Sequence, residues 1–101
     1  EEISVSTPSI MELSKCASLS DDPPEEKEKI RSLLSSLLVF DFDQECAMKA
    51  GEIEAELRKK GQMIDLEDIM IAAIALQHHE PLVTRNIRHF EKIKGLEIEA
   101  Y

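Results

Sequence analysis

Residues 64–86 read IDLEDIMIAAIALQHHEPLVTRN and decide how the rest of the chain is organised. Asp65 and Asp68 share the first turn of a predicted helix, where the positive end of the helix dipole favours carboxylates. Every side chain from 69 to 76 is apolar, which predicts a buried helix body. After a turn, the letters LVT predict a short buried strand that ends in polar residues.

The polar end of that strand carries Thr84, Arg85 and Asn86. Ligands of open α/β sheets bind at the carboxyl ends of strands, and Mg²⁺ or Mn²⁺ prefers oxygen ligands. Acidic residues on a buried helix, facing this strand end, therefore suggest a metal site. Taken alone, Asp65 and Asp68 are explained more simply as ordinary helix-start charge.

Composition limits the classes of protein to which this chain can belong. Its 101 residues predict a single domain, and 43% hydrophobic residues allow a modest, mainly aliphatic core. A net charge of −9 gives no overall basic surface for nucleic acid, although metal ions can bridge carboxylates to phosphates. Cys16 and Cys46 form no CxxC pair, which argues against a zinc site and predicts a reducing, cytoplasmic setting. No apolar run is long enough to span a membrane.

Helices and short strands alternate along the chain, which predicts an α/β fold with a mostly parallel sheet flanked by helices over residues 1–101. A weak strand signal at Ile3 and Val5 precedes the first helix. We expect Thr7 to cap that helix ahead of Pro8, with Ser9 and Glu12 forming a capping box. Further expected features are Asp22 and Asp43 as N-caps, Gly61 as a helix end, apolar faces at Ile10, Leu13, Ala17 and at Ile30, Leu33, Leu34, Leu37, a strand at 38–42, a helical turn at 87–93 and a last strand at 96–101.

Other sequence patterns point to little chemistry. Residues 41–52 partly match a calcium loop, but the position that needs glycine is Cys46. Adjacent His78 and His79 would point in different directions on a helix, so they favour a helix-end role over chelation. His89 is expected to be a surface residue. Neither a GxSxG motif nor a glycine-rich phosphate loop occurs.

The ordered motifs resemble PIN-domain ribonucleases, including the VapC toxins of prokaryotic toxin–antitoxin pairs. The similarity rests on three segments, covers nearly the whole chain and keeps the motifs in order. These segments are Thr7-Pro8-Ser9-Ile10-Met11-Glu12-Leu13, the helix pattern from Gly61 through Ile64 and Asp68 to Ala75, and Leu82-Val83-Thr84-Arg85-Asn86 followed by Phe90, Ile93, Gly95 and Leu96.

The resemblance implies a three-layer PIN-like fold and a Mg²⁺- or Mn²⁺-dependent endoribonuclease. Glu12 and Asp68 would take the family's acidic positions, with Asn86 as a further ligand and Thr84 as a supporting hydroxyl. Asp65 would be an auxiliary metal-site acid, and Glu67 a weaker one. Arg85 and Arg88 would contact RNA phosphates, although solvated charge explains them equally well. The family also implies a homodimer and a VapB-like antitoxin partner.

One departure from the family pattern affects the expected activity. The family begins with an apolar strand that ends in a metal-binding Asp, and residues 1–101 contain no such segment before Ile3. We therefore expect a fold that is incomplete at its N-terminus and little nuclease activity from residues 1–101 alone. The alternative function is a non-catalytic PIN-like binding or scaffold module.

Overall fold

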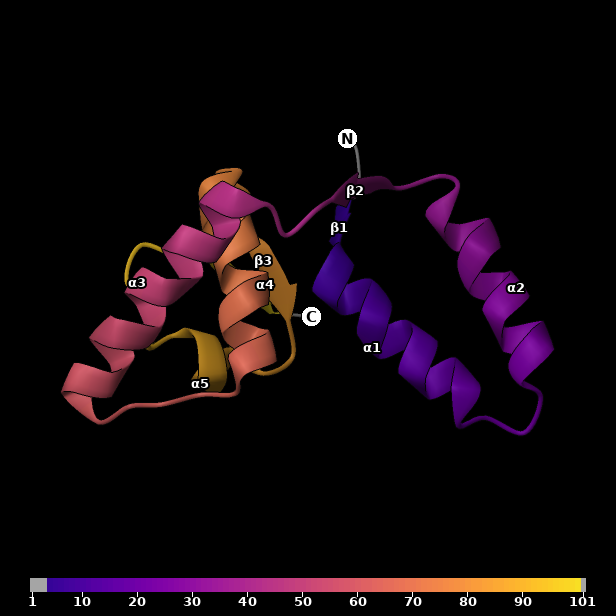
Figure 1. The fold of residues 1–101 in the computed structure, drawn as a ribbon, viewed down its shortest axis with the longest axis horizontal. Helices are drawn as coiled ribbons and strands as arrows, with labels where there is room; N and C mark the ends of the chain where they lie inside the picture. The colour runs from indigo at the N-terminus through magenta and orange to yellow at the C-terminus, as the bar shows by residue number, and fades with distance from the viewer. Residues whose placement is uncertain (1–3, 101) are drawn as a thin grey trace. The chain divides into compact units, whose positions relative to one another are not determined.

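The structure is a computed structural model that describes residues 4–100. Helices and short strands are interleaved in it, and two consecutive helices follow each of the first two strands, as Figure 1 shows. The chain divides into two compact units, Glu1–Asp41 and Phe42–Tyr101. Both strand pairs are parallel, which confirms the predicted α/β class. The elements are β1 (Ser4–Ser6), α1 (Thr7–Ser18), α2 (Pro23–Leu34), β2 (Leu38–Phe40), α3 (Gln44–Lys60), α4 (Leu66–Gln77), β3 (Leu82–Thr84), α5 (Ile87–Phe90) and β4 (Ile98–Ala100).

The first unit pairs β1 with β2 in parallel, from Ser4 opposite Leu38 to Ser6 opposite Phe40. The helix α1 begins one residue earlier than predicted, because Ser6 is its N-cap and accepts a hydrogen bond from the Ser9 backbone N–H at 3.4 Å. The prediction that Thr7 caps this helix is therefore wrong. The predicted capping box between Ser9 and Glu12 is wrong as well, since Ser9 lies inside the helix.

The helices α1 and α2 pack against each other, but they bury few side chains. Asp22 caps α2 as predicted, accepting a hydrogen bond from the Glu25 backbone N–H at 3.2 Å. No side chain of α2 is buried, and Leu33 is 50% exposed and Leu13 37% exposed. The predicted apolar faces therefore exist as patterns, yet a pair of helices offers too little surface to cover them fully.

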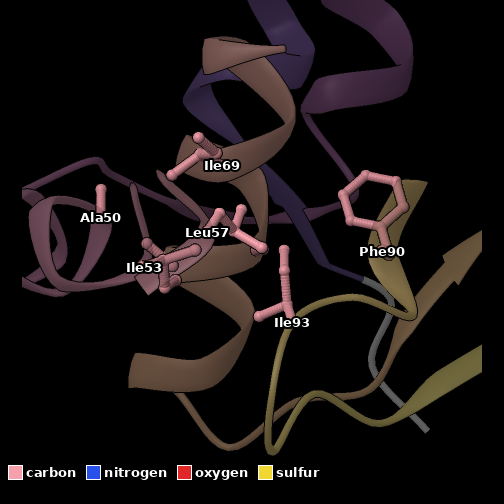
Figure 2. Close-up of a cluster of buried hydrophobic side chains, with 8 residues drawn as sticks. Ala50, Ile53, Leu57, Ile69, Phe90 and Ile93 are labelled. Carbon is pink, nitrogen blue, oxygen red and sulfur yellow. The ribbon is translucent and has the colours of Figure 1, made fainter. Parts of the chain in front are cut away.

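The second unit holds the hydrophobic core, which is centred on the packing of α3 against α4. The helix α3 begins at its N-cap Asp43 and ends at Gly61, as predicted, where a left-handed φ of 67° suits glycine. Figure 2 shows side chains from α3, α4, α5 and the following segment gathered around α4. The buried members are Ala50, Ile53, Leu57, Ile69, Ala72, Ala73, Phe90 and Ile93.

The strands β3 and β4 pair in parallel, from Leu82 opposite Ile98 to Thr84 opposite Ala100. Thr84 is therefore the last residue of its strand, as the sequence predicted. The predictions at Ile3 and Tyr101 lie outside the described residues. Within residues 4–100, no helix combines the length and apolar character needed to cross a membrane. Both cysteines are free thiols.

The N-cap of α3 leads to a prediction about pH. The Asp43 side chain accepts a hydrogen bond from the Cys46 backbone N–H at 2.9 Å, and this bond holds the pKa of Asp43 below its ordinary 3.8. Because the folded-state pKa is the lower one, the carboxylate stabilises the fold fully above the unfolded pKa, and this contribution is lost as pH falls through the folded pKa. We expect Asp43→Asn to keep the cap and to lose stability less steeply on acidification.

Thermal unfolding followed by circular dichroism, from neutral pH down to about pH 2, measures this difference. Parallel loss of Tm in the two proteins would show that Asp43 does not contribute to the acid sensitivity.

Candidate functional site

Asp68 lies in the first turn of α4, where its side chain is half-buried. The helix begins after its N-cap Asp65, and the apolar residues that follow are buried against α3. Asp68 directly precedes Ile69, which is fully buried, so the core fixes its place on the helix. The Asp68 side chain is 19% exposed. A carboxylate at this place is accessible to a small ion while its backbone is rigidly held.

His89 contacts this carboxylate. Its Nδ1 lies 3.0 Å from Asp68 Oδ2, which is hydrogen-bonding distance. The contact joins two segments that are 21 residues apart in sequence, and it places α5 beside the first turn of α4. One oxygen of Asp68 is thus engaged by the imidazole, and Oδ1 remains available to a ligand. His89 is exposed, as predicted, but nothing in the sequence indicated its contact with Asp68.

A tight turn links β3 to α5 and places Asn86 close to His89. The Asn86 backbone N–H donates to Thr84 Oγ1 at 3.0 Å. The Asn86 carbonyl accepts from the His89 backbone N–H at 3.1 Å. Asn86 is the N-cap of α5, but its side-chain amide makes no capping bond. The Thr84 hydroxyl therefore orders the turn, and the Asn86 backbone contacts the residue whose side chain meets Asp68.

Two further acids accompany Asp68 at the helix start. Asp65 is the N-cap residue, yet its side chain makes no capping hydrogen bond. Its backbone carbonyl instead accepts from the Ile69 backbone N–H at 3.1 Å. Glu67 lies in the first turn and is half-buried. Asp65 is thus an exposed acid near Asp68 along the chain, in keeping with the auxiliary role that the resemblance implies.

Glu12 lies in the first unit, in the middle of α1. Both of its carboxylate oxygens lie 3.1 Å from Lys15 Nζ, one turn further along the helix. The side chain is 39% exposed. This ion pair replaces the capping box that the sequence suggested. Its part in the same site as Asp68 stays a prediction, because the two residues belong to different units.

Arg85 and Arg88 flank the turn that carries Asn86, and both are exposed. Arg88 precedes His89 directly, so its backbone lies next to the contact with Asp68. In the second unit, hydrogen bonds link Thr84 to Asn86, Asn86 to His89 and His89 to Asp68. That these residues form one site stays a prediction.

The donor chemistry around Asp68 suits a hard cation. Carboxylate, amide and hydroxyl oxygens are ligands that Mg²⁺ and Mn²⁺ accept. Throughout residues 4–100, no three His, Cys, Asp or Glu side chains stand close enough together to hold a metal ion among themselves. Mg²⁺ is commonly held by only one or two carboxylates, with waters and substrate phosphates completing its shell. The residues present therefore fit a magnesium-type ion anchored on Asp68, and they do not fit a zinc cage.

Comparison with known proteins places the chain in a family. A PIN domain model matches residues 1–96. Ribonuclease VapC2 of Rickettsia felis is 34% identical over 99 residues, which make up 98% of this chain and 74% of that protein. The tRNA(fMet)-specific endonuclease VapC of Salmonella typhimurium is 37% identical over 97 residues, covering 96% and 74% of the two chains.

Solved structures show the same similarity in three dimensions. VapBC2 from Rickettsia felis, bound to a DNA fragment from its promoter, matches with a TM-score of 0.92 and 33% identity, over 99% of this chain and 75% of that one. DNA-bound VapBC from Salmonella typhimurium matches with a TM-score of 0.91 and 36% identity, over 96% and 74%. The chain thus spans about three quarters of the length of these relatives.

Proposed function

The chain belongs to the PIN-domain family and groups with its VapC ribonucleases, and from that premise we propose that it serves a metal-dependent endoribonuclease, the toxin of a toxin–antitoxin pair. The observation that carries this proposal is the position of Asp68. This half-buried carboxylate is fixed by His89 beside the ordered turn that follows β3. The substrate class is RNA, and the reaction is hydrolysis of a phosphodiester bond.

Three candidate residues of the second unit have separate roles in this proposal. Asp68 would hold Mg²⁺ or Mn²⁺, and the Asn86 amide would be a further ligand. Thr84 keeps Asn86 in place through its hydroxyl group. When bound, the cation supplies a water of lowered pKa and neutralises charge that develops on the phosphate.

Glu12, Asp65 and the two arginines complete the proposed site. The resemblance gives Glu12 the family's second acidic position, and Lys15 engages its carboxylate in this structure. Asp65 supports the ion from the start of α4. Arg85 and Arg88 bind phosphates of the RNA, because the guanidinium fork matches phosphate geometry.

The proposed partners are a VapB-like antitoxin and a second copy of the chain. The solved relatives are VapBC complexes, which supports an antitoxin. The first unit also leaves large apolar side chains open, with Leu19 79% and Met11 57% exposed. Exposed apolar surface of this kind is typical of protein-binding sites.

A non-catalytic binding module is the second candidate. It is favoured by one observation, which is that the part of the chain described here contains no cluster of three metal-binding side chains. A module of this kind would be indifferent to Mn²⁺. A ribonuclease site would bind the ion and lose it when Asp68 is replaced.

Cleavage of a labelled single-stranded RNA by residues 1–101, with protein in excess and Mn²⁺ present, tests the proposal. We expect slow cleavage, because the resemblance assigns no residue of 1–101 to the family's first metal-binding aspartate. Both EDTA and Asp68→Ala should abolish it. Cleavage that survives Asp68→Ala would contradict the proposed function. A fast, Asp68-dependent rate would instead contradict the expectation that a ligand is missing.

A further inference from the structure

The cations of the chain differ in whether an ion pair neutralises them. On the longer helices, Lys15, Lys29, Arg31, Arg58 and Lys60 each lie within 4.0 Å of a glutamate one turn away. Within the described chain, Arg88, Lys92 and Lys94 make no hydrogen bond or ion pair through their side chains, and all three are exposed. Their positive charge is therefore available to a partner.

Arg88, Lys92 and Lys94 lie in one short segment. Residues 85–94 read RNIRHFEKIK and hold four of the chain's 12 Lys and Arg residues, with Glu91 as their only acid. The whole chain carries a net charge of −9, so this segment is a local positive region on an acidic protein. Such a region attracts an anionic ligand that the rest of the surface repels.

The segment begins at the candidate site and leads to a pocket. His89, next to Arg88, contacts Asp68. Further along, Lys92 and Lys94 line a pocket of about 150 Å³ together with Lys49 of α3. Lys49 likewise makes no ion pair in the described part of the chain. Leu76 of α4 also lines the pocket, and it lies roughly 12 Å along the helix from Asp68, at about 1.5 Å per residue.

We infer that Arg88, Lys92, Lys94 and Lys49 form a basic strip that binds the phosphate backbone of the RNA on one side of the cut. This inference rests on the proposed function and names where its substrate lies. A strand of a few nucleotides with one phosphate at Asp68 reaches the pocket along α5. The strip thereby provides a positively charged binding surface for RNA on a protein whose net charge is negative.

The lining of the pocket indicates how much sequence information the strip reads. Its apolar part consists of Ile53, Leu57, Leu76 and Ile93, and it contains no aromatic ring on which a base could stack. Contacts between ammonium groups and phosphates position a nucleic acid without reading its bases. Glu52 and Glu56 also line the pocket, and Glu56 is paired with Lys60 at 3.4 Å. The strip therefore gives affinity that is uniform across RNA sequences.

The salt dependence of RNA binding tests the strip. Binding of a fluorescent single-stranded RNA to the full chain with Asp68→Ala, which prevents cleavage, is measured by anisotropy at several KCl concentrations. For a single strand, removing one lysine that neutralises a phosphate reduces the slope of log K against log[salt] by about 0.7. We therefore expect Lys92→Ala with Lys94→Ala to reduce the slope by about 1.4, twice that value, and to weaken binding to all RNA sequences alike.

Two matched variants distinguish an effect of the strip from an effect of overall charge and from misfolding. Lys27→Ala with Lys59→Ala removes the same charge from α2 and α3, at two other lysines without an ion pair in the described residues, and should leave the slope nearly unchanged. Lys92→Arg with Lys94→Arg should retain the slope of the parent protein, because it keeps both charges.

The remaining outcomes each overturn a different statement. If the Lys27→Ala/Lys59→Ala variant loses as much slope as the Lys92→Ala/Lys94→Ala variant, the overall charge of the protein explains the salt dependence and the strip does not. An unchanged slope, with Lys92 and Lys94 instead required for binding poly-glutamate, would assign the strip to an acidic protein. RNA binding with an unchanged slope would refute the strip alone. Failure of every variant and of the parent to bind RNA would refute the proposed function as well.

Discussion

Replacing Asp68 by asparagine is expected to weaken Mn²⁺ binding by about 100-fold. Removing a residue that hydrogen-bonds to a metal ligand already lowers metal affinity by roughly 10- to 100-fold, and removing the ligand itself should lower it at least as much. The substitution preserves the size of the side chain and its ability to hydrogen-bond to His89. It removes the negative charge on which the proposed ion depends. The Asp68 side chain is only 19% exposed, so few water molecules can reach it. They therefore compensate poorly for the lost attraction between the carboxylate and the ion.

Electron paramagnetic resonance of free Mn²⁺, recorded during titration of the protein at constant ionic strength, measures the affinity without any need for catalysis. Glu91→Gln is the matched control, because it removes one exposed acid from the neighbouring segment without a contact to Asp68. Equal weakening in the two variants would mean that net charge alone attracts the ion. Undiminished binding by Asp68→Asn would place the ion elsewhere.

The same titration separates the role of His89 from that of Asp68. His89 Nδ1 holds Asp68 Oδ2 at 3.0 Å, so His89→Ala should free the carboxylate to rotate and weaken Mn²⁺ binding by roughly 10-fold, as for other partners of metal ligands. His89→Asn places a hydrogen-bonding group where Nδ1 stood and should restore most of the affinity. A purely structural role would leave the affinity of both variants unchanged.

Local sequence signals predicted the helix ends well wherever a single residue type determines where the helix starts or stops. Asp22 and Asp43 accept hydrogen bonds at the starts of α2 and α3, and Gly61 adopts the left-handed end that its type favours. The start of α1 was harder to place, since Ser6, Thr7 and Ser9 are all competent caps. The strand that precedes the helix decided among them, because β1 ends at Ser6.

Contacts between elements could be predicted only where patterns on two elements pointed to the same kind of site. The acidic helix start and the polar strand end pointed to Asp68, Thr84 and Asn86, and a shared site for them stays a prediction. The contact of His89 with Asp68 spans 21 residues, and a lone histidine carries no sign of such a partner. The joint participation of Glu12 and Asp68 stays a prediction, because it depends on the arrangement of two separate units.

Truncation of Leu57 to alanine is expected to destabilise the second unit by about 2–5 kcal/mol, the usual cost of a buried Leu-to-Ala change. Leu57 is 1% exposed and belongs to the cluster in which α3 packs against α4 (Figure 2). Leu66→Ala is the matched control. That leucine is 62% exposed at the first position of α4, so its loss should change stability by no more than about 0.5 kcal/mol.

Urea denaturation followed by circular dichroism gives the difference between the two variants. A destabilisation of this size is a large part of the total stability of a small unit, so α4 should open more often in Leu57→Ala and Asp68 should lose its fixed position. Mn²⁺ binding should therefore weaken in Leu57→Ala at temperatures where Leu66→Ala still binds normally. If both variants unfold at the same urea concentration, the packing of α3 on α4 is not what holds the candidate site in place.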